Sequence, residues 1–185
     1  MRIVDWSRED LRQHIDRVID IYCAAMGYPK EVGRQRKGYV IVHTQREGFR
    51  AVAATDESDG VVGFAYGYRG TPGQWWHDEV RRALTKQQIE QWLADPFELC
   101  ELHVRPDRQG HGLGQEMLTR LLRECPHQTV VLSTPEGESR AWRLYRRMGF
   151  VDIRRNHRFA GDDRPFAVLG RPLPLDVDTT SAGRG

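Results

Sequence analysis

The sequence predicts an α/β (α+β) domain built around a mixed β-sheet. Three observations support this class. Short runs rich in β-branched and aromatic residues alternate with segments whose apolar residues recur at helical spacing. Strand pairs typical of hairpins lie towards both ends of the chain, at 48–70 and 149–173. The apolar run at 129–134 is typical of a strand buried on both faces of a sheet.

The N-terminal part predicts a strand, two helices and a hairpin. The strand covers 1–6, and Ser7 is expected to cap a single helix over 8–26. Apolar residues recur at helical spacing within that helix: Leu11, Ile15, Val18, Ile19 and Tyr22. Gly27 and Pro29 are expected to end it, and a second helix follows over 31–44. The hairpin at 48–70 has two β-compatible runs around the polar loop "DESDG".

The middle of the chain predicts two short helices, a strand and a third helix. Thr85 and Gln88 have the spacing of a capping box, and Pro96 is expected to close the second helix. A strand over 97–104 then leads into a glycine-rich loop and a helix that extends to about Cys125. The loop therefore joins the end of a strand to the start of a helix.

The C-terminal part predicts a buried strand, a helix and a final strand pair. The helix covers 138–148, and the two strands lie within 149–159 and 164–173. The last residues, 176–185, have nothing to bury and are expected to be disordered. We therefore predict one domain over 1–175 with a disordered tail.

Bulk composition excludes several classes of protein. A chain of 185 residues with a net charge of +2 suits one globular domain and lacks the clustered cations of a nucleic-acid binder. No run approaches the roughly 20 apolar residues of a membrane helix. Cys23, Cys100 and Cys125 lie in apolar contexts without CxxC spacing, which indicates reduced core cysteines and a cytoplasmic protein.

The loop "RPDRQGHGLG" at 105–114 is either a plain turn or a phosphate seat. Gly110, Gly112 and Gly114 permit positive φ, and the following helix offers unpaired backbone N–H groups at its start. A Walker A loop would need Lys-Ser/Thr after the last glycine, where Gln115 and Glu116 stand instead. The dinucleotide fingerprint needs G-x-G-x-x-G after the first strand, whereas the spacing here is G-x-G-x-G past mid-chain.

A third pattern fits this loop. "QGHGLG" at 109–114 resembles Gln/Arg-x-x-Gly-x-Gly/Ala, the pyrophosphate loop of the GNAT superfamily of acyl-CoA-dependent N-acyltransferases. "AWRLYRRMGF" at 141–150 is similar to that family's second signature, at the expected distance downstream. The resemblance extends over most of the chain in element order. It implies one GNAT-like domain whose mixed, mostly antiparallel sheet of about seven strands splays at strands 4 and 5, with helices on both faces.

The resemblance also implies a ligand and the residues that bind it. Acetyl-CoA would be the co-substrate, and no metal would be used. The pyrophosphate would bind backbone amides of the loop, contributed by Gln109, Gly110, His111, Gly112, Leu113 and Gly114. The pantetheine arm would pair with the fourth strand beside Leu102, His103 and Val104. A backbone N–H of that strand would then meet the thioester carbonyl as an oxyanion donor.

Attack of an amine on the thioester needs a base, and the leaving thiolate can use an acid. Tyr145 matches the family's acid, and the alternative is a packing tyrosine. Glu98, Glu101 and His103 are the candidate bases, with Glu101 favoured and a purely structural role open for each. Strict alternation would place Glu101 with His103 on one face and Glu98 with Leu102 and Val104 on the other. A bulge, usual in this strand of the family, would alter that phase.

The identity of the acceptor stays open at this point. A small-molecule amine is favoured, and the alternatives are a protein amino group or a non-catalytic acyl-CoA-binding module. Residues 73–95 form a helical insertion longer than the family's usual link, and its Trp75, Trp76 and Trp92 either cage an amine or pack the extra helices. Arg34, Arg36 and Lys37 are candidates for steering an acidic substrate. The sequence does not determine the oligomeric state, and a homodimer is among the states that it allows.

Overall fold

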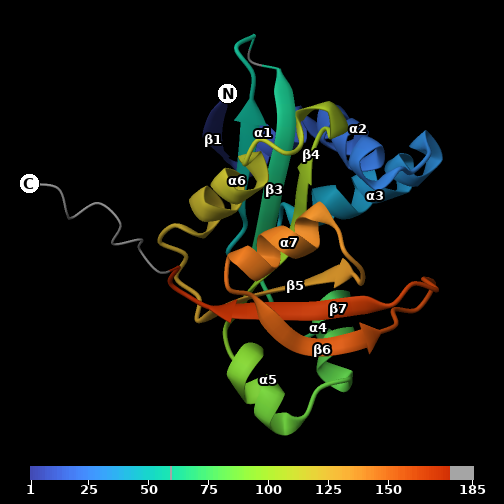
Figure 1. The fold of residues 1–185 in the computed structure, drawn as a ribbon, viewed down its shortest axis with the longest axis vertical. Helices are drawn as coiled ribbons and strands as arrows, with labels where there is room; N and C mark the ends of the chain where they lie inside the picture. The colour runs from blue at the N-terminus through green and yellow to red at the C-terminus, as the bar shows by residue number, and fades with distance from the viewer. Residues whose placement is uncertain (59, 176–185) are drawn as a thin grey trace, which may run out of the picture.

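The computed structural model describes residues 1–58 and 60–175, and they form one seven-stranded sheet. The sheet has the order β1-β2-β3-β4-β5-β7-β6 (Figure 1). Every neighbouring pair is antiparallel except β4 and β5, which run parallel, so the predicted fold class is confirmed. The strands are β1 (Arg2–Trp6), β2 (Arg50–Thr55), β3 (Val61–Arg69), β4 (Pro96–Val104), β5 (Thr129–Pro135), β6 (Val151–His157) and β7 (Phe166–Pro172).

Helices cover both faces of this sheet (Figure 1). They are α1 (Arg8–Gln13), α2 (Ile15–Met26), α3 (Lys30–His43), α4 (Trp75–Arg82), α5 (Lys86–Trp92), α6 (Leu113–Leu122) and α7 (Arg140–Arg147), with a 3₁₀ turn at Pro106–Arg108. The helices α6 and α7 lie on one face. On the other face, α1 to α3 cover the N-terminal strands, while α4 and α5 cover β5, β6 and β7.

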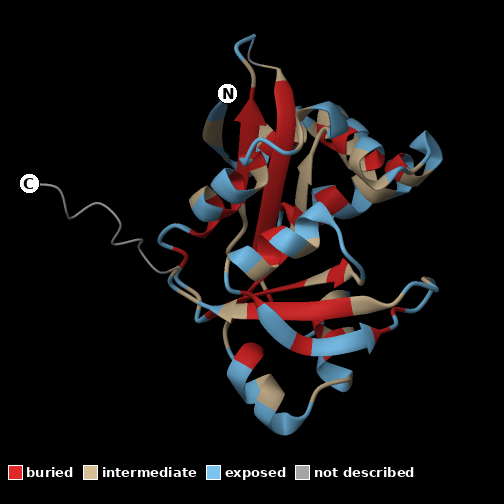
Figure 2. Ribbon diagram, in the orientation of Figure 1, coloured by how far each residue is buried: buried red, intermediate tan, exposed pale blue. Residues whose placement is uncertain are grey.

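Buried apolar residues form one core under α6 and α7 on one face of the sheet, and on the other face a second core under α1 to α3 and a third core under α4 and α5. Figure 2 shows in red the buried positions along the strands and helices. Under α6 and α7, apolar residues such as Met117 and Leu121 pack on Phe97 and Leu99 of β4. Under α1 to α3, Leu11 and its neighbours pack on side chains of β2 and β3 that point the other way. Side chains of β4 therefore enter one core or the other, and this fixes which of them can meet.

Some helix ends agree with those that the sequence predicts, and others differ from them. The predicted single helix over 8–26 is wrong, since α1 ends and α2 begins at His14. Its ring stacks on Trp6 at 4.9 Å between centroids, and its Nδ1 lies 2.8 Å from the Asp10 carbonyl oxygen, which holds the break. The Ser7 cap and the Thr85 capping box are both confirmed. Pro96 begins β4 and does not close α5, which ends at Trp92.

The segment 73–95 contains the two short helices that the sequence predicts, α4 and α5. They pack on the C-terminal half of the sheet through Val80 and Leu93, which contact side chains of β5 and β7. The tail that we predict to be disordered, 176–185, lies outside the described residues.

Candidate active site

A gap opens in the sheet where β4 and β5 separate. The two strands pair only at Pro96–Thr129, Phe97–Val130 and Glu98–Val131, although both continue for several residues beyond that point. Residues 99–104 of β4 therefore face β5 without a strand partner on that side. Backbone N–H and C=O groups left in this way need another partner, and an extended ligand can supply one.

A bulge in β4 decides which side chains line the gap. Tyr66 of β3 pairs with Glu101 and Gly67 pairs with Leu99, so Cys100 is the extra residue. Glu98 consequently lies opposite Tyr68, on the same sheet face as Glu101. The expected separation of the two glutamates by strict alternation is wrong. Glu98 shares the face of Glu101 and His103, whereas Leu102 and Val104 pack in the opposite core.

Close packing at Gly67 accompanies this bulge. A Cβ added to Gly67 would lie 2.2 Å from the carbonyl oxygen of Glu98 and 2.6 Å from the ring of Phe97. Any side chain there would push β4 away from β3. Glycine is thus required for the close approach of the two strands.

Glu101 is held by two partners. Arg36 of α3 donates from Nη2 to one carboxylate oxygen, and Nε2 of His103 lies 2.5 Å from the other. Burial opposes ionisation of this carboxyl, but Arg36 and then His103 outweigh it and lower its pKa to about 2. Such a carboxylate is a weak base with both oxygens occupied, which disfavours the proton-accepting role that the sequence favours for it.

Glu98 has the opposite environment. Its side chain is buried, and among the described residues Oε2 has no hydrogen-bond partner. Burial raises the pKa of this carboxyl to about 7, although Arg46 and Tyr68 oppose the shift. A carboxylate with a pKa near the working pH and a free oxygen meets the requirements of a general base.

Tyr145 lies on the other face of the sheet from the two glutamates. It lies on α7 and packs in the core under α6 and α7, with its ring 5.4 Å from that of Phe150. Burial, with a contribution from the charge of Glu101, raises the pKa of this phenol and keeps it protonated. The gap thus lies between carboxylates on one face and a protonated phenol on the other.

The glycine loop ends at the start of α6. Gly110 and Gly112 have φ values of +84° and +81°, in the left-handed region that favours glycine. Gly112 is the N-cap of α6 and offers no side-chain cap, so the first N–H groups of the helix are available to an anion. Gln109 donates from Nε2 to the Val104 carbonyl at 2.9 Å, which ties the loop to the end of β4.

This loop also packs against α7. A Cβ on Gly114 would lie 3.2 Å from Leu144, and one on Gly110 would lie 3.0 Å from the guanidinium of Arg140. The two glycines therefore let α6 and its loop approach α7 closely. Arg140 adds a positive charge beside the amides of the loop, which suits a phosphate.

A polar cluster surrounds Cys100, which lies between the two glutamates in the sequence, and no sequence pattern predicts this cluster. The Sγ atom of Cys100 lies within 3.6–3.9 Å of His43, Tyr66, Tyr68 and Arg36. Burial raises the pKa of the Cys100 thiol to about 12, so it is not a nucleophilic thiolate. No periodicity marks these residues as neighbours, because they come from α3, β3 and β4.

The three tryptophans of the insertion have different surroundings. Trp92 is buried among apolar residues of the third core. Trp76 packs on that core and donates from Nε1 to Ser133 Oγ of β5 at 2.9 Å, beyond the last β4–β5 pair. Trp75 is 57% exposed, with its ring 5.6 Å from that of Phe159. Trp92 and Trp76 therefore pack the extra helices onto the sheet, which is one of the two roles that the sequence allows for them; the other role is to cage an amine.

Residues 1–58 and 60–175 contain neither a cluster of metal ligands nor a helix that could span a membrane. Within these ranges, no group of three or more His, Cys, Asp or Glu residues is arranged to hold a metal ion. Over the same residues, no helix combines the length and apolar character that a membrane span requires.

Comparison with known proteins identifies the family. Residues 15–150 match the model of the Acetyltransferase (GNAT) family. The GCN5-like protein acetyltransferase Rv2170 of Mycobacterium tuberculosis is 39% identical over 202 residues, which cover 94% of this chain and 98% of that protein. These matches define the protein as an acetyltransferase. The chain belongs to the GNAT family, as the loop and the second signature indicate.

Solved structures agree with this fold at low sequence identity. An aminoglycoside 6'-N-acetyltransferase complexed with coenzyme A is 17% identical, with a TM-score of 0.67 over 96% of this chain and 100% of that one. The ribosomal-protein-S18-alanine N-acetyltransferase of Escherichia coli is 18% identical, with a TM-score of 0.63 over 96% of this chain and 97% of that one. The arrangement of the sheet and its helices is thus shared with both enzymes.

Proposed function

We propose that the protein transfers the acetyl group of acetyl-CoA to a primary amine of a small molecule, by direct attack of the amine on the thioester. The observation that carries this proposal is the gap between β4 and β5, with Glu98 on one face of the sheet and Tyr145 on the other. A base and an acid on the two sides of one opening suit a reaction that removes a proton from an amine and returns one to a thiolate.

The co-substrate would bind along β4 and its loop. Backbone amides from Gln109 to Gly114 would hold the pyrophosphate, supported by the positive φ of Gly110 and Gly112 and the uncapped start of α6. The pantetheine arm would pair with the open side of β4 at Leu102, His103 and Val104. A β4 amide would then stabilise the oxyanion that forms when the thioester carbonyl is attacked.

Glu98 would be the base in this scheme, with Glu101 as the alternative. The ammonium form of the amine loses a proton to Glu98, and the neutral amine attacks the carbonyl carbon. The adduct expels the thiolate, which takes a proton from Tyr145, and the second proton lost by the nitrogen restores the phenol. The raised pKa of Glu98 and its free oxygen support this choice, whereas the occupied oxygens of Glu101 support a structural role. His103 would orient Glu101 and would not accept the proton itself.

The test is a free-thiol assay with a panel of amines, combined with calorimetry of acetyl-CoA binding. We expect acetyl-CoA to bind, and ATP and NAD not to bind, because the loop lacks the residues that those ligands need. Glu98→Gln and Tyr145→Phe should bind acetyl-CoA normally and release thiol slowly. Normal turnover in both variants would support a different mechanism, and binding without turnover of any amine would leave only the acyl-CoA-binding module.

A protein amino group is the second candidate acceptor. The relative at 39% identity is named a protein acetyltransferase, which favours this alternative. Incubation of the enzyme and labelled acetyl-CoA with a lysine-containing peptide library and with the amine panel would separate the two. Faster labelling of peptides than of every small amine would favour the protein acceptor.

A further inference from the structure

Arg36 lies on the face of the sheet that carries Glu98, where the amine of the proposed reaction would bind. It projects from α3 towards β4 and binds Glu101, on the face of the sheet that also carries Glu98. Its guanidinium carbon lies 5.5 Å from the ring centroid of Tyr22 on α2, and that ring lies 5.4 Å from His103. Two helices and a strand therefore fix the position of this guanidinium.

The guanidinium is only partly used by these contacts. Within the described residues Arg36 donates through Nη2 alone, to Glu101 and weakly to Cys100. Its Nε is buried and has no partner in the same part of the chain. The side chain is 27% exposed, whereas that of Glu101 is 8% exposed. The cation is thus more exposed than the anion with which it pairs, and it has N–H donors that these contacts do not use.

The charges of the surrounding elements favour an anion here. Helix α3 carries Lys30, Arg34, Arg36 and Lys37 against one acidic residue, Glu31. Glu31 and Asp16 are paired with cations of this helix at 3.8 and 2.7 Å. Glu101 is neutralised by Arg36 itself. Among the acidic residues that the structure describes on α2, α3 and β4, only Asp20 and Glu98 form no ion pair, so these elements offer few free carboxylates to an acceptor with several positive charges.

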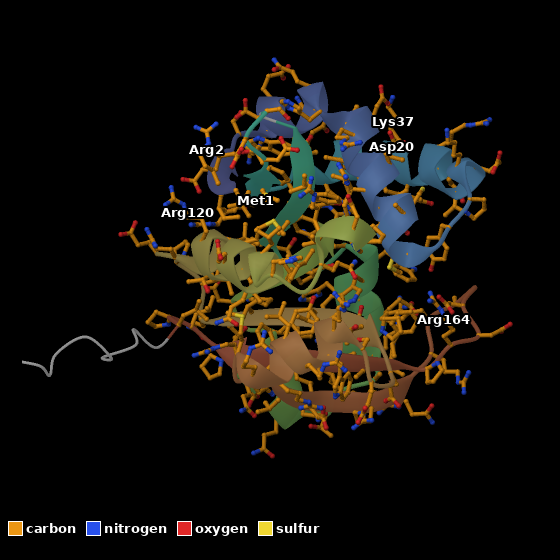
Figure 3. The ribbon with its side chains drawn as sticks, turned by 45° about the horizontal axis from the view of Figure 1, so that its top comes forward. Met1, Arg2, Asp20, Lys37, Arg120 and Arg164 are labelled. Atoms are coloured by element: carbon orange, nitrogen blue, oxygen red, sulfur yellow. The ribbon has the colours of Figure 1, made fainter. Side chains whose placement is uncertain are left out.

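Two tyrosines connect Arg36 with a neighbouring loop, where Arg164 is paired with Asp162 at 2.8 Å. Arg164, between β6 and β7, donates from Nη2 to the hydroxyl of Tyr28, between α2 and α3, at 2.8 Å. Figure 3 shows Arg164 at the end of the β6–β7 hairpin, on the side of the molecule where the α2–α3 loop lies. The ring of Tyr28 lies 5.8 Å from that of Tyr22, so aromatic rings lead from Arg164 inwards to Arg36.

We propose that the acceptor is an amine that also carries a carboxylate a few bonds away, and that Arg36 binds this carboxylate while the amine faces Glu98. This inference rests on the proposed acetyl transfer and narrows its substrate class to amino acids and related amino-carboxylates. A guanidinium is suited to this role because its planar N–H groups match the two oxygens of a carboxylate. Arg36 is then a specificity-determining residue.

The test uses matched pairs of acceptors that differ only in the carboxylate. Phenylalanine, leucine and glutamate are each compared with their α-carboxamides at saturating acetyl-CoA, by free-thiol release. The amine of a carboxamide is less basic and more of it is neutral at pH 8, so chemistry alone favours the amide. We expect kcat/KM of the preferred acid to exceed that of its amide by about 10- to 100-fold, as expected for a hydrogen bond to a charged group.

Variants assign this preference to one side chain. Arg36→Gln should bring the ratio of kcat/KM for the acid to kcat/KM for its amide close to one. Arg36→Lys should restore part of the preference for the acid, because the positive charge returns. The double variant Arg36→Gln with Glu101→Gln does not leave Glu101 ionised without its partner Arg36, and it should show the same loss of ratio. Arg82→Gln is the matched control, since Arg82 lies on α4, away from α2 and α3, with a 70% exposed side chain, and its ratio should stay within about twofold of wild type.

Each outcome has a defined meaning. Amides that react as fast as the acids, or an unchanged ratio in Arg36→Gln, overturn the proposal. If acetyl-CoA binds in calorimetry and other amines are acetylated while no acid of the panel reacts, the proposal is also overturned and the acetyl transfer stands. If acetyl-CoA does not bind, the proposed function itself fails.

Discussion

Replacing Glu98 with glutamine should raise the stability of the protein and remove its activity at the same time. Folding raises the pKa of this carboxyl from 4.5 to about 7, because burial disfavours the ionised form. The folded state therefore holds the proton more tightly than the unfolded state. It follows that the contribution of Glu98 to the free energy of unfolding falls as the pH rises from about 4.5 to about 7, and is level above that.

The size of this effect follows from the same two values. Each pH unit in the interval costs about 1.4 kcal/mol, so the ionised Glu98 destabilises the folded protein by about 3 kcal/mol at pH 8. A neutral glutamine of the same shape avoids this cost. We expect Glu98→Gln to exceed wild type by about 3 kcal/mol at pH 8 and to match it at pH 4, whereas kcat should fall about 100-fold or more without its base.

Urea unfolding at pH 4 and pH 8 measures the change in the free energy of unfolding, and thiol release from pH 5 to 9 measures the change in activity. The wild-type kcat/KM should fall tenfold per pH unit below about pH 7, and the kcat/KM of the variant should not show this decrease. Glu90→Gln, on the exposed side of α5, is the control and should change neither quantity. A Glu98→Gln protein that is no more stable than wild type at pH 8 would refute the reasoning, because its carboxyl would then not be destabilised by burial.

Three further substitutions test the gap, the loop and the bulge. Tyr145→Phe removes only a hydroxyl, so kcat should fall about 100-fold while the free energy of unfolding stays within about 1 kcal/mol of wild type; an unchanged kcat contradicts the acid role. Gly112→Ala places an alanine at φ +81°, which should cost about 1–2 kcal/mol in urea unfolding and also weaken acetyl-CoA binding in calorimetry. Gly27→Ala, at φ +68° at the end of α2, should lose similar stability but bind acetyl-CoA normally. Gly67→Ala should lose about 3 kcal/mol because its Cβ would strike the neighbouring β4 carbonyl at 2.2 Å, whereas Gly38→Ala meets nothing within 4 Å; equal stabilities would show that the strands are not packed as described.

Local signals explain why much of the fold could be predicted from the sequence. Ser7 and Thr85 cap helices because a hydroxyl three residues before an acid or amide satisfies N–H groups within a single turn. Gly110 and Gly112 mark the loop because only glycine adopts a positive φ there without strain. Both effects depend on neighbours a few residues apart, and such neighbours are visible in the sequence.

The details that set the candidate site depend on contacts between distant residues. The break at His14 is held by stacking on Trp6, a strand residue that helical periodicity does not include. The bulge at Cys100 depends on how β4 pairs with Gly67, and it reverses the predicted relation of the two glutamates. The pairing of Arg36 with Glu101 joins residues 65 positions apart. Alternation and spacing carry no information on these contacts, so the favoured base changed once the structure was known.

The separation of β4 and β5 also has a consequence for the protein in a crowded solution. Beyond Glu98 the chain carries open strand edges in the middle of its sheet, and open edges are templates on which other chains can polymerise. The bulge at Cys100 interrupts the regular edge, and Gln109 occupies the carbonyl of the last β4 residue. Both features are recognised ways of discouraging association between edges. The distortion that gathers the carboxylates therefore also guards the opening against self-association.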